Sequence, residues 1–249
     1  HKPKPKGVNF FKLVHLERAE EILLSSFIQL KDHRCVVRCS RVCKFWNAVS
    51  RQNSLWRDLC ISLWSDKVFI PDQFKPLNTS GRSREAFINS LMDSKRTAIT
   101  SEELSSILFY FRFKEVAGSY WTDQDPFWQK QEPLRITFTP EGRLVGFPWD
   151  VLEAKWRFVD NSGKTCQTRG SFIRVSVNDR SVPTYMVSRH SNWGFILQNC
   201  WVVYFSFPMP PIGAELSLDD RALDELMDDE RWGEALAYNS GAPMPHDDE

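Results

Sequence analysis

Short segments of alternating apolar and polar residues, separated by turn residues, fill the second half of the chain and constrain its fold more than any other feature. Residues that favour tight reversals occupy the joins, as in Pro140-Glu141-Gly142 and Asn161-Ser162-Gly163. Joins this short cannot hold a crossover helix, so neighbouring strands must run antiparallel. We expect a meander that closes into a β-barrel or a β-sandwich. The predicted strands are residues 134–139, 143–146, 153–160, 171–177, 184–188, 193–198 and 201–207.

The first quarter of the chain has a helical pattern instead, with apolar residues at spacings of three and four. Residues 13–64 contain neither Pro nor Gly. A first helix is predicted to have a face made of Ile22, Leu23, Ser26 and Phe27. After the polar turn at residues 31–33, a second helix is predicted with a face made of Val36, Val37, Ser40, Val42, Cys43 and Trp46. A third, short helix is predicted over residues 55–63.

These patterns divide the chain into four parts and predict an α+β fold. Residues 10–66 form a helical module, and residues 67–115, with predicted helices at 83–94 and 101–109, form a helical connector. Residues 116–212 form the antiparallel β domain. Residues 213–249 form a tail with twelve acidic residues against two arginines, in which the apolar spacing predicts one amphipathic helix.

The charge and cysteine content narrow the class of partner and compartment. Thirty-two Lys and Arg residues balance thirty-two Asp and Glu residues, so we expect neither nucleic acid nor an anionic membrane as a partner. No apolar run has the length of a membrane span. The six cysteines lack the paired spacing of a disulfide framework, which favours a reducing compartment, the cytoplasm or nucleus, or an organellar assembly. A start at His1 rather than Met is typical of a fragment or a processed form.

Residues 20–56 carry a set of features that together resemble the F-box family. These are the acidic start Glu21-Ile22-Leu23, the apolar spacing to Phe27 and Leu30, the Lys31-Asp32 turn, and Val42-Cys43-Lys44-x-Trp46 followed by Leu55-Trp56. The resemblance implies a helical module that binds the small Skp adaptor. That adaptor bridges to a cullin and so to a ubiquitin-conjugating machine. A module of this kind binds other proteins and does not catalyse a reaction.

The resemblance also implies which side chains face the adaptor. An apolar face too large for its own core is buried against a partner, and each side chain contributes roughly 1.5 to 3 kcal/mol before association costs. The sequence departs from the family at Arg18-Ala19, where a Leu-Pro pair is usual, and this is expected to lower adaptor affinity. The positions carried over are Ile22, Leu23, Phe27, Leu30, Val37, Val42 and Trp46.

Tryptophan and arginine side chains are interleaved in the predicted β domain. Such side chains are the usual anchors of recognition surfaces, although a barrel interior would take most of the tryptophans. A binding surface of this composition at one end of the β domain favours an acidic or phosphorylated peptide of a client protein. The candidates nearest to loops and strand ends are Arg169, Arg189, His190, Asn192 and Trp193.

Catalytic and metal chemistry have little support in the sequence. Cys35, Cys39 and Cys43 follow one another at four-residue intervals on the predicted second helix, but the fourth ligand of a zinc site is missing, so packing in the core is favoured. The pair His190 and Cys200 lacks a third group that would orient it. We therefore predict no catalytic residues, no metal and no cofactor.

Three functions follow, in order of preference. The first is a substrate receptor that links a client protein, held by the β domain, to the Skp adaptor of a cullin ligase. The second is a structural subunit that uses a degenerate F-box as a fixed contact in a large assembly. The third is a carrier of a small ligand, because residues 118–121, Gly-Ser-Tyr-Trp, are similar to the opening strand of lipocalin-like barrels. This third function needs an open apolar cavity.

Overall fold

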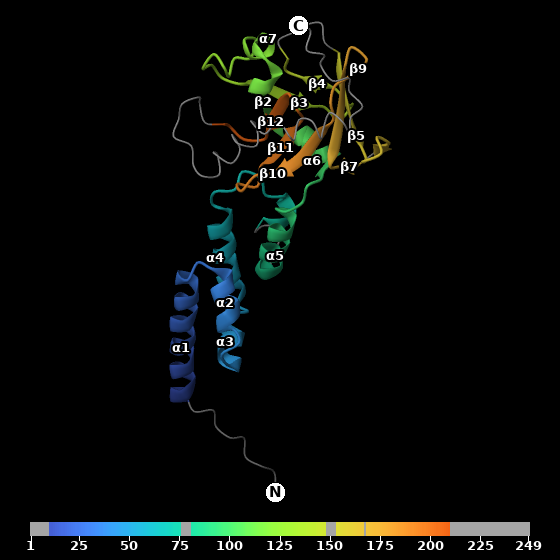
Figure 1. Cartoon of the computed structure of the whole chain (residues 1–249). Coiled ribbons are helices and arrows are strands. Elements are labelled where there is room, and N and C mark those ends of the chain that lie inside the picture. Colours follow the sequence, from blue (N-terminus) through green and yellow to red (C-terminus); the bar gives the residue numbers. More distant parts are fainter. Residues whose placement is uncertain (1–9, 76–80, 148–152, 167, 210–249) are drawn as a thin grey trace. The chain divides into compact units, whose positions relative to one another are not determined.

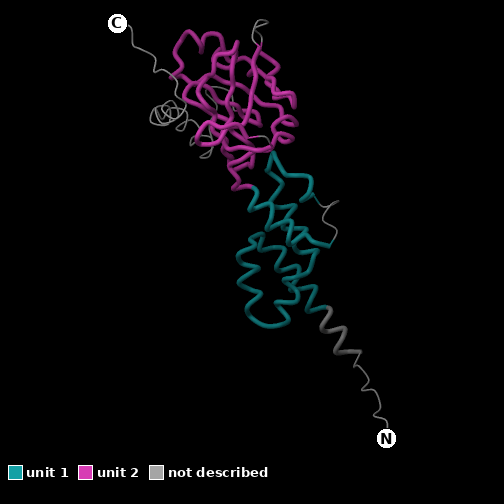
Figure 2. The backbone as a smooth tube through the Cα atoms, turned by 90° about the vertical axis from the view of Figure 1, so that its right-hand side faces the viewer, with its two compact units in different colours: residues 1–93 teal, residues 94–249 magenta. Residues whose placement is uncertain are grey.

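A computed structural model of the chain describes residues 10–75, 81–147, 153–166 and 168–209. Contacts between Cα atoms divide the chain into two compact units, residues 1–93 and residues 94–249 (Figure 2). Each unit has its own core and is described separately below. The acidic tail predicted at residues 213–249, with its amphipathic helix, lies outside the described residues.

Unit 1 is entirely helical in its described part (Figure 1). Its elements are α1 (Phe10–Gln29), α2 (His33–Cys39), α3 (Lys44–Val49), α4 (Asn53–Trp64), the 3-10 helix η1 (Asp72–Phe74) and α5 (Ser83–Asp93). Asp32 caps α2, because its carboxylate accepts a hydrogen bond of 2.8 Å from the backbone N–H of Arg34. This bond also lowers the pKa of the Asp32 carboxyl group.

The predicted second helix is two helices, and the prediction of a single one was wrong. α2 ends at Cys39, and the Ser40 hydroxyl group donates a 2.7 Å hydrogen bond to the carbonyl oxygen of Val37. Cys43 then has an extended backbone before α3 begins. Polar residues of this kind compete for backbone hydrogen bonds at helix ends, so the apolar spacing alone overestimated the length of the helix.

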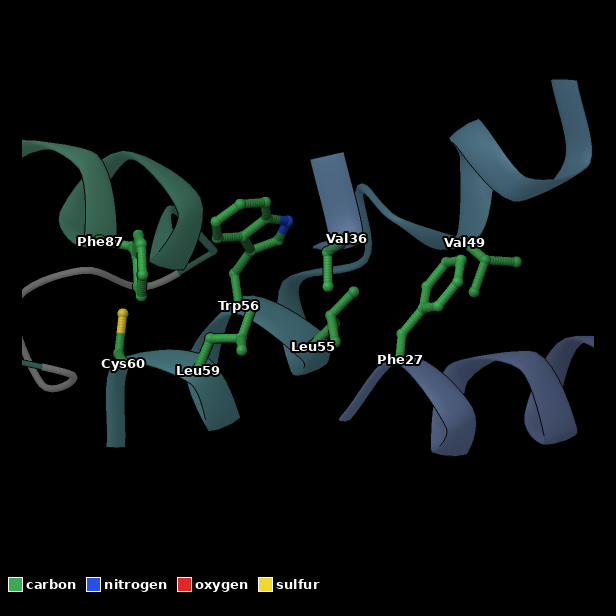
Figure 3. Close-up of a cluster of buried hydrophobic side chains, with 8 residues drawn as sticks. All are labelled: Phe27, Val36, Val49, Leu55, Trp56, Leu59, Cys60 and Phe87. Carbon is green, nitrogen blue, oxygen red and sulfur yellow. The ribbon is translucent and has the colours of Figure 1, made fainter. Parts of the chain in front are cut away.

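The core of unit 1 joins α1 to α5. Figure 3 shows Phe27 of α1 pointing toward Val49 of α3, with Trp56 and Phe87 at the other end of the same cluster. The rings of Trp56 and Phe87 meet edge to face, with centroids 5.4 Å apart. The indole N–H of Trp56 donates a 2.7 Å hydrogen bond to the carbonyl oxygen of Ser50, so this buried polar group has a partner. α5 is therefore part of the core of the helical module.

Unit 2 is built around one curled antiparallel sheet, a half-barrel. The strand order is β4-β3-β2-β12-β11-β10-β8-β5-β6, with β9 paired to β8. The backbone bridge between Arg143 and Lys155 connects the β4 side of the sheet to β5. The strands are β2 (Leu108–Phe113), β3 (Leu134–Phe138), β4 (Leu144–Val145), β5 (Ala154–Val159), β6 (Thr165–Cys166), β8 (Phe172–Val177), β9 (Arg180–Ser181), β10 (Tyr185–Arg189), β11 (Phe195–Gln198) and β12 (Val202–Phe205).

Smaller elements complete unit 2. β1 (Ile99–Thr100) and β7 (Arg169–Gly170) form a separate two-stranded antiparallel sheet. α6 (Ser101–Ser106) begins with a capping box, in which Thr100 and Glu103 each bond the backbone N–H of the other. The 3-10 helix η2 (Glu115–Ala117) and α7 (Ser119–Thr122) follow β2.

The α+β fold class is confirmed, and each of the seven predicted strand segments contains a strand. Two other expectations differ from the structure. The segment expected to extend a helix to residue 109 instead enters β2, which pairs with β3 and β12, so the sheet begins before the expected boundary at residue 116. Gly118 precedes the helix α7 as its N-cap and residues 119–121 belong to that helix, so their likeness to a lipocalin opening strand was wrong. No helix in the described part of the chain has the length and apolarity needed to cross a membrane.

Candidate functional site

Three of the predicted adaptor-facing side chains are exposed on unit 1. Ile22 on α1 is 68% exposed, Val42 in the turn between α2 and α3 is 65% exposed, and Leu30 after α1 is 43% exposed. Exposed apolar side chains that form a contiguous patch are typical of a protein-interaction surface, whereas scattered ones are common on any surface. We call Ile22, Leu30 and Val42 the exposed apolar set.

The other four predicted positions are covered to a larger extent by the chain itself. Leu23, Val37 and Trp46 are half-buried and pack against the core of unit 1, and Phe27 is only 2% exposed. The Trp46 ring meets the Phe27 ring edge to face, with centroids 5.7 Å apart. In this conformation Phe27 supports the half-buried side chains from below and offers a partner almost no surface.

The departure from the family pattern lies inside a continuous helix. Arg18 and Ala19 are exposed residues of α1, which begins at Phe10. Proline is tolerated in the first turn of a helix and disfavoured in its interior, so a Leu-Pro pair at this point would mark a helix start. With Arg18-Ala19 there, α1 continues past it toward the N-terminus. The Gln52 side chain donates a hydrogen bond to the Glu20 carboxylate and so ties α1 to the start of α4.

The three closely spaced cysteines do not share one helix. Cys35 and Cys39 lie on α2, whereas Cys43 lies in the extended residue before α3. The Cys35 thiol donates a 3.3 Å hydrogen bond to the Asp32 carboxylate, and this bond raises the pKa of the thiol. Among the described residues, no group of three or more His, Cys, Asp or Glu side chains could hold a metal ion.

Four of the five predicted client-binding residues lie in and beside the β10–β11 turn. The Arg189 guanidinium lies 4.1 Å from the centre of the Phe195 ring, and the His190 ring stacks on Phe207 at 5.0 Å. The Asn192 side chain accepts a 2.9 Å hydrogen bond from the Gly194 N–H within the turn. Trp193, 6% exposed, lies in the interior. Arg169 lies on β7, opposite Thr100 of β1.

A basic depression of about 520 Å³ lies elsewhere on unit 2, over β5, β8 and β9. Arg157 of β5 stands directly opposite Arg174 of β8, and Arg143 and Lys155 also line the depression, against the two carboxylates of Glu141 and Asp179. Lys155 pairs with Glu153 at 3.1 Å, whereas the three arginines form no ion pair with a described residue. Like charges directly opposite each other on neighbouring strands are destabilising. A bound anion would relieve that repulsion.

The basic depression was not predicted as a site, although the sequence carries part of its signal. Lys155 and Arg157 alternate with apolar residues on one strand, and Arg174 and Ser176 do so on another. Only the register, which places Arg157 opposite Arg174 and Lys155 opposite Ser176, brings the two rows together. None of the five predicted client-binding residues lines this depression.

A second hollow, of about 840 Å³, is mainly apolar and uses the opposite set of β8 side chains. We call it the apolar cavity. Val175 and Val177 of β8 line it, whereas Arg174 and Ser176 of the same strand line the basic depression. This alternation is the two-residue period of a strand. The aromatic lining consists of Phe111, Phe113, Phe147, Tyr185, Trp201 and Tyr204, together with Trp121 at α7.

Comparison with known proteins identifies a domain within unit 1. The F-box-like family model matches residues 20–62. This part of the chain, which spans α2, α3 and most of α4 together with the second half of α1, is an F-box-like domain, a protein-interaction module without catalytic function. No curated protein and no solved structure matches the chain.

Proposed function

We propose that the protein is the substrate receptor of a cullin ubiquitin ligase. In this proposal the F-box-like domain binds a Skp-type adaptor, and the half-barrel holds a client protein close to the ubiquitin-conjugating machine. The rate of ubiquitin transfer would increase because the client is held near the ubiquitin-conjugating enzyme, without catalytic residues in this chain. The observation that carries the proposal is the F-box-like match at residues 20–62, together with the exposed apolar set, which lies within the matched residues.

The exposed apolar set would supply much of the adaptor affinity. Ile22 and Val42 are about two-thirds exposed in the free chain, so burying them against a partner removes apolar area that this chain leaves in water. Leu23 and Trp46 beside them are half-buried and anchored on the core, which limits the side-chain entropy lost on binding. Leu30 and Val37 extend the proposed contact, with Phe27 supporting it from within.

Binding of purified Skp-type adaptor to charged variants tests this proposal. Ile22→Asp and Val42→Asp each place a charge in the proposed contact, and each is expected to weaken binding by at least about tenfold. Met92→Asp is the matched control, because Met92 is 69% exposed on α5, outside the matched residues. If Met92→Asp weakens binding as much as Ile22→Asp does, or if the wild type does not bind at micromolar concentration, the proposal is wrong.

For the client, we propose an acidic or phosphorylated segment that binds the basic depression. Arg143, Arg157 and Arg174 converge there without an ion-pair partner among the described residues, and guanidinium groups bind carboxylates and phosphates in a bidentate manner. A second proposed client contact is the β10–β11 turn together with β7. Its residues are Arg169, Arg189, His190, Asn192 and Trp193. Arg189 and His190 already stack on rings of this chain, which leaves them less available than the arginines of the depression.

A library of random peptides with a central phosphoserine, compared with the same library carrying serine, separates the two contacts. The Arg157→Ser variant is expected to lose the preference for phosphoserine, whereas Arg189→Ser is expected to keep it. The reverse pattern would move the client contact to the β10–β11 turn. Equal binding of both libraries by the wild type would contradict an anionic client segment.

A structural subunit with a degenerate F-box is the alternative function, and one observation favours it. α1 runs through Arg18 and Ala19 without the helix start that a Leu-Pro pair would give. Under this alternative the chain would co-purify in fixed stoichiometry with a large assembly. Ile22→Asp and Trp46→Asp would then leave the half-life of every bound protein unchanged. If the protein is a substrate receptor, the same two substitutions should make its client accumulate.

A further inference from the structure

The apolar cavity lies on the inner side of the curled sheet and has an uncharged floor. Tyr185 of β10 and Tyr204 of β12 lie at this floor, are almost completely buried and have ring centroids 5.3 Å apart. Burial raises the pKa of both phenol groups, so both stay neutral at physiological pH. A charged group would lose its hydration deep in such a cavity without compensation.

The polar groups inside the cavity are already used by the protein. The hydroxyl groups of Tyr185 and Tyr204 lie close enough to influence each other's pKa. The Asn199 side chain donates to the carbonyl oxygen of Pro183 at 3.0 Å and accepts from the backbone N–H groups of Trp201 and Val202 at 2.9 and 2.8 Å. A peptide backbone inserted here would leave its own N–H and C=O groups without partners, at a cost of roughly 1 to 3 kcal/mol for each group. The inner part of the cavity therefore suits a hydrocarbon.

The rim carries a positive charge. Arg180 of β9 is exposed, lines the cavity and forms no ion pair with a described residue. Asn178 and Asp179 make the tight reversal before it, with φ angles of 49° and 61°. Asp179 lines the basic depression instead, and no described Asp or Glu lines the apolar cavity. The rim can therefore pair with one anionic head group.

The mouth of the cavity exposes apolar side chains to water. Val116, at η2, is 52% exposed, and Trp121, on α7, is 44% exposed; both line the cavity. Gly118, with a φ of 88°, makes the reversal between these two short helices. A ligand with an apolar body would cover these side chains as it enters, which adds to the burial gained inside.

From these observations we infer that the apolar cavity binds a small amphiphile, a medium-chain monocarboxylate whose hydrocarbon body lies among the aromatic side chains and whose carboxylate meets Arg180. A volume of about 840 Å³ is within the usual range for small-molecule sites. This function is additional to adaptor binding and uses residues of unit 2 alone.

Titration of the full chain with octanoate, decanoate and dodecanoate, followed by isothermal calorimetry, tests the inference. The affinity is expected to rise roughly fourfold with each added methylene group. Decanol, which has the same chain length as decanoate without its charge, is expected to bind more weakly than decanoate. Arg180→Gln is expected to lower the affinity for decanoate by about fivefold and to leave the affinity for decanol unchanged. Lys164→Gln, at an exposed residue of unit 2 that lines neither hollow, is the matched control and is expected to change neither.

Filling the cavity provides an independent variant. Ala117→Trp at the mouth is expected to abolish binding of all three carboxylates, and Val182→Trp serves the same purpose if Ala117→Trp does not fold, as judged by circular dichroism. The inference is overturned if folded wild type shows no saturable binding, if affinity does not rise with chain length, or if a filled cavity still binds. Tighter binding of an apolar peptide than of dodecanoate would overturn the choice of ligand. Adaptor binding, measured separately on the same preparation, reports on the proposed function alone.

Discussion

The Trp46 ring stands edge-on to the Phe27 ring, with centroids 5.7 Å apart and planes inclined at 74°. Trp46 is half-buried, and Phe27 is enclosed in the core of unit 1. The pair thus links the proposed adaptor contact to the stability of the module. It also separates two kinds of substitution, those that remove core volume and those that change the surface alone.

Phe27→Ala is expected to destabilise unit 1 by about 3 to 5 kcal/mol, because it leaves a cavity beneath the F-box-like surface. Ile22→Ala, at a side chain that is 68% exposed, is expected to change stability by no more than about 0.5 kcal/mol. Urea denaturation of each variant measures both values. A small effect of Phe27→Ala would show that Phe27 does not lie in the core.

Arg157→Ser is expected to stabilise unit 2 by roughly 0.2 to 1 kcal/mol, since it removes one of two like charges that face each other across β5 and β8. The gain should shrink as salt is added, because screening weakens the repulsion in the wild type. Thermal melts at low and high ionic strength measure this difference. A loss of stability at low salt would mean that Arg157 makes a favourable contact that outweighs the repulsion.

Glu103 makes the stability of unit 2 depend on pH. Burial alone would raise the pKa of its carboxyl group, but the paired Arg96 guanidinium, 2.6 Å away, and the Thr100 N–H lower it below the ordinary value of 4.5. A lowered pKa in the folded state means that the stabilisation is complete above the unfolded pKa and is lost as the pH falls through the folded pKa. Glu103→Gln is expected to cost about 1 to 2 kcal/mol at neutral pH.

Denaturation of the wild type and Glu103→Gln, from neutral pH down to about pH 3, measures this contribution. The two stabilities are expected to converge as the pH falls below the ordinary glutamate pKa. A difference that stays constant over the whole range would mean that the ionised carboxylate is not the source of the effect.

The strands were predictable because turn residues bound them and because their two faces differ. β5 illustrates this, since buried Phe158 follows exposed Arg157. β2 was missed for the opposite reason. Residues 108–111 of that strand, Leu-Phe-Tyr-Phe, form an uninterrupted apolar and aromatic run, and a short run of this kind has no periodicity that separates a strand from the end of a helix.

The sites were harder to predict than the elements. The F-box resemblance selected Ile22 and Val42, which are exposed. The residue spacing alone does not show that Phe27, on α1 with Ile22, is enclosed in the core. The facing pair Arg157 and Arg174 depends on a strand register that the sequence does not specify. The apolar cavity depends on how strongly the sheet curls, and the pattern of alternation is the same for a filled barrel and a hollow one.

Hydrogen exchange of the full chain, with and without purified Skp-type adaptor, tests the central claim most directly. The F-box-like domain is expected to gain protection at backbone amides of α1, α2 and α3, around Ile22 and Val42, while the amides of the β sheet keep their exchange rates. Protection confined to the sheet, or no change anywhere at saturating adaptor, would contradict the account.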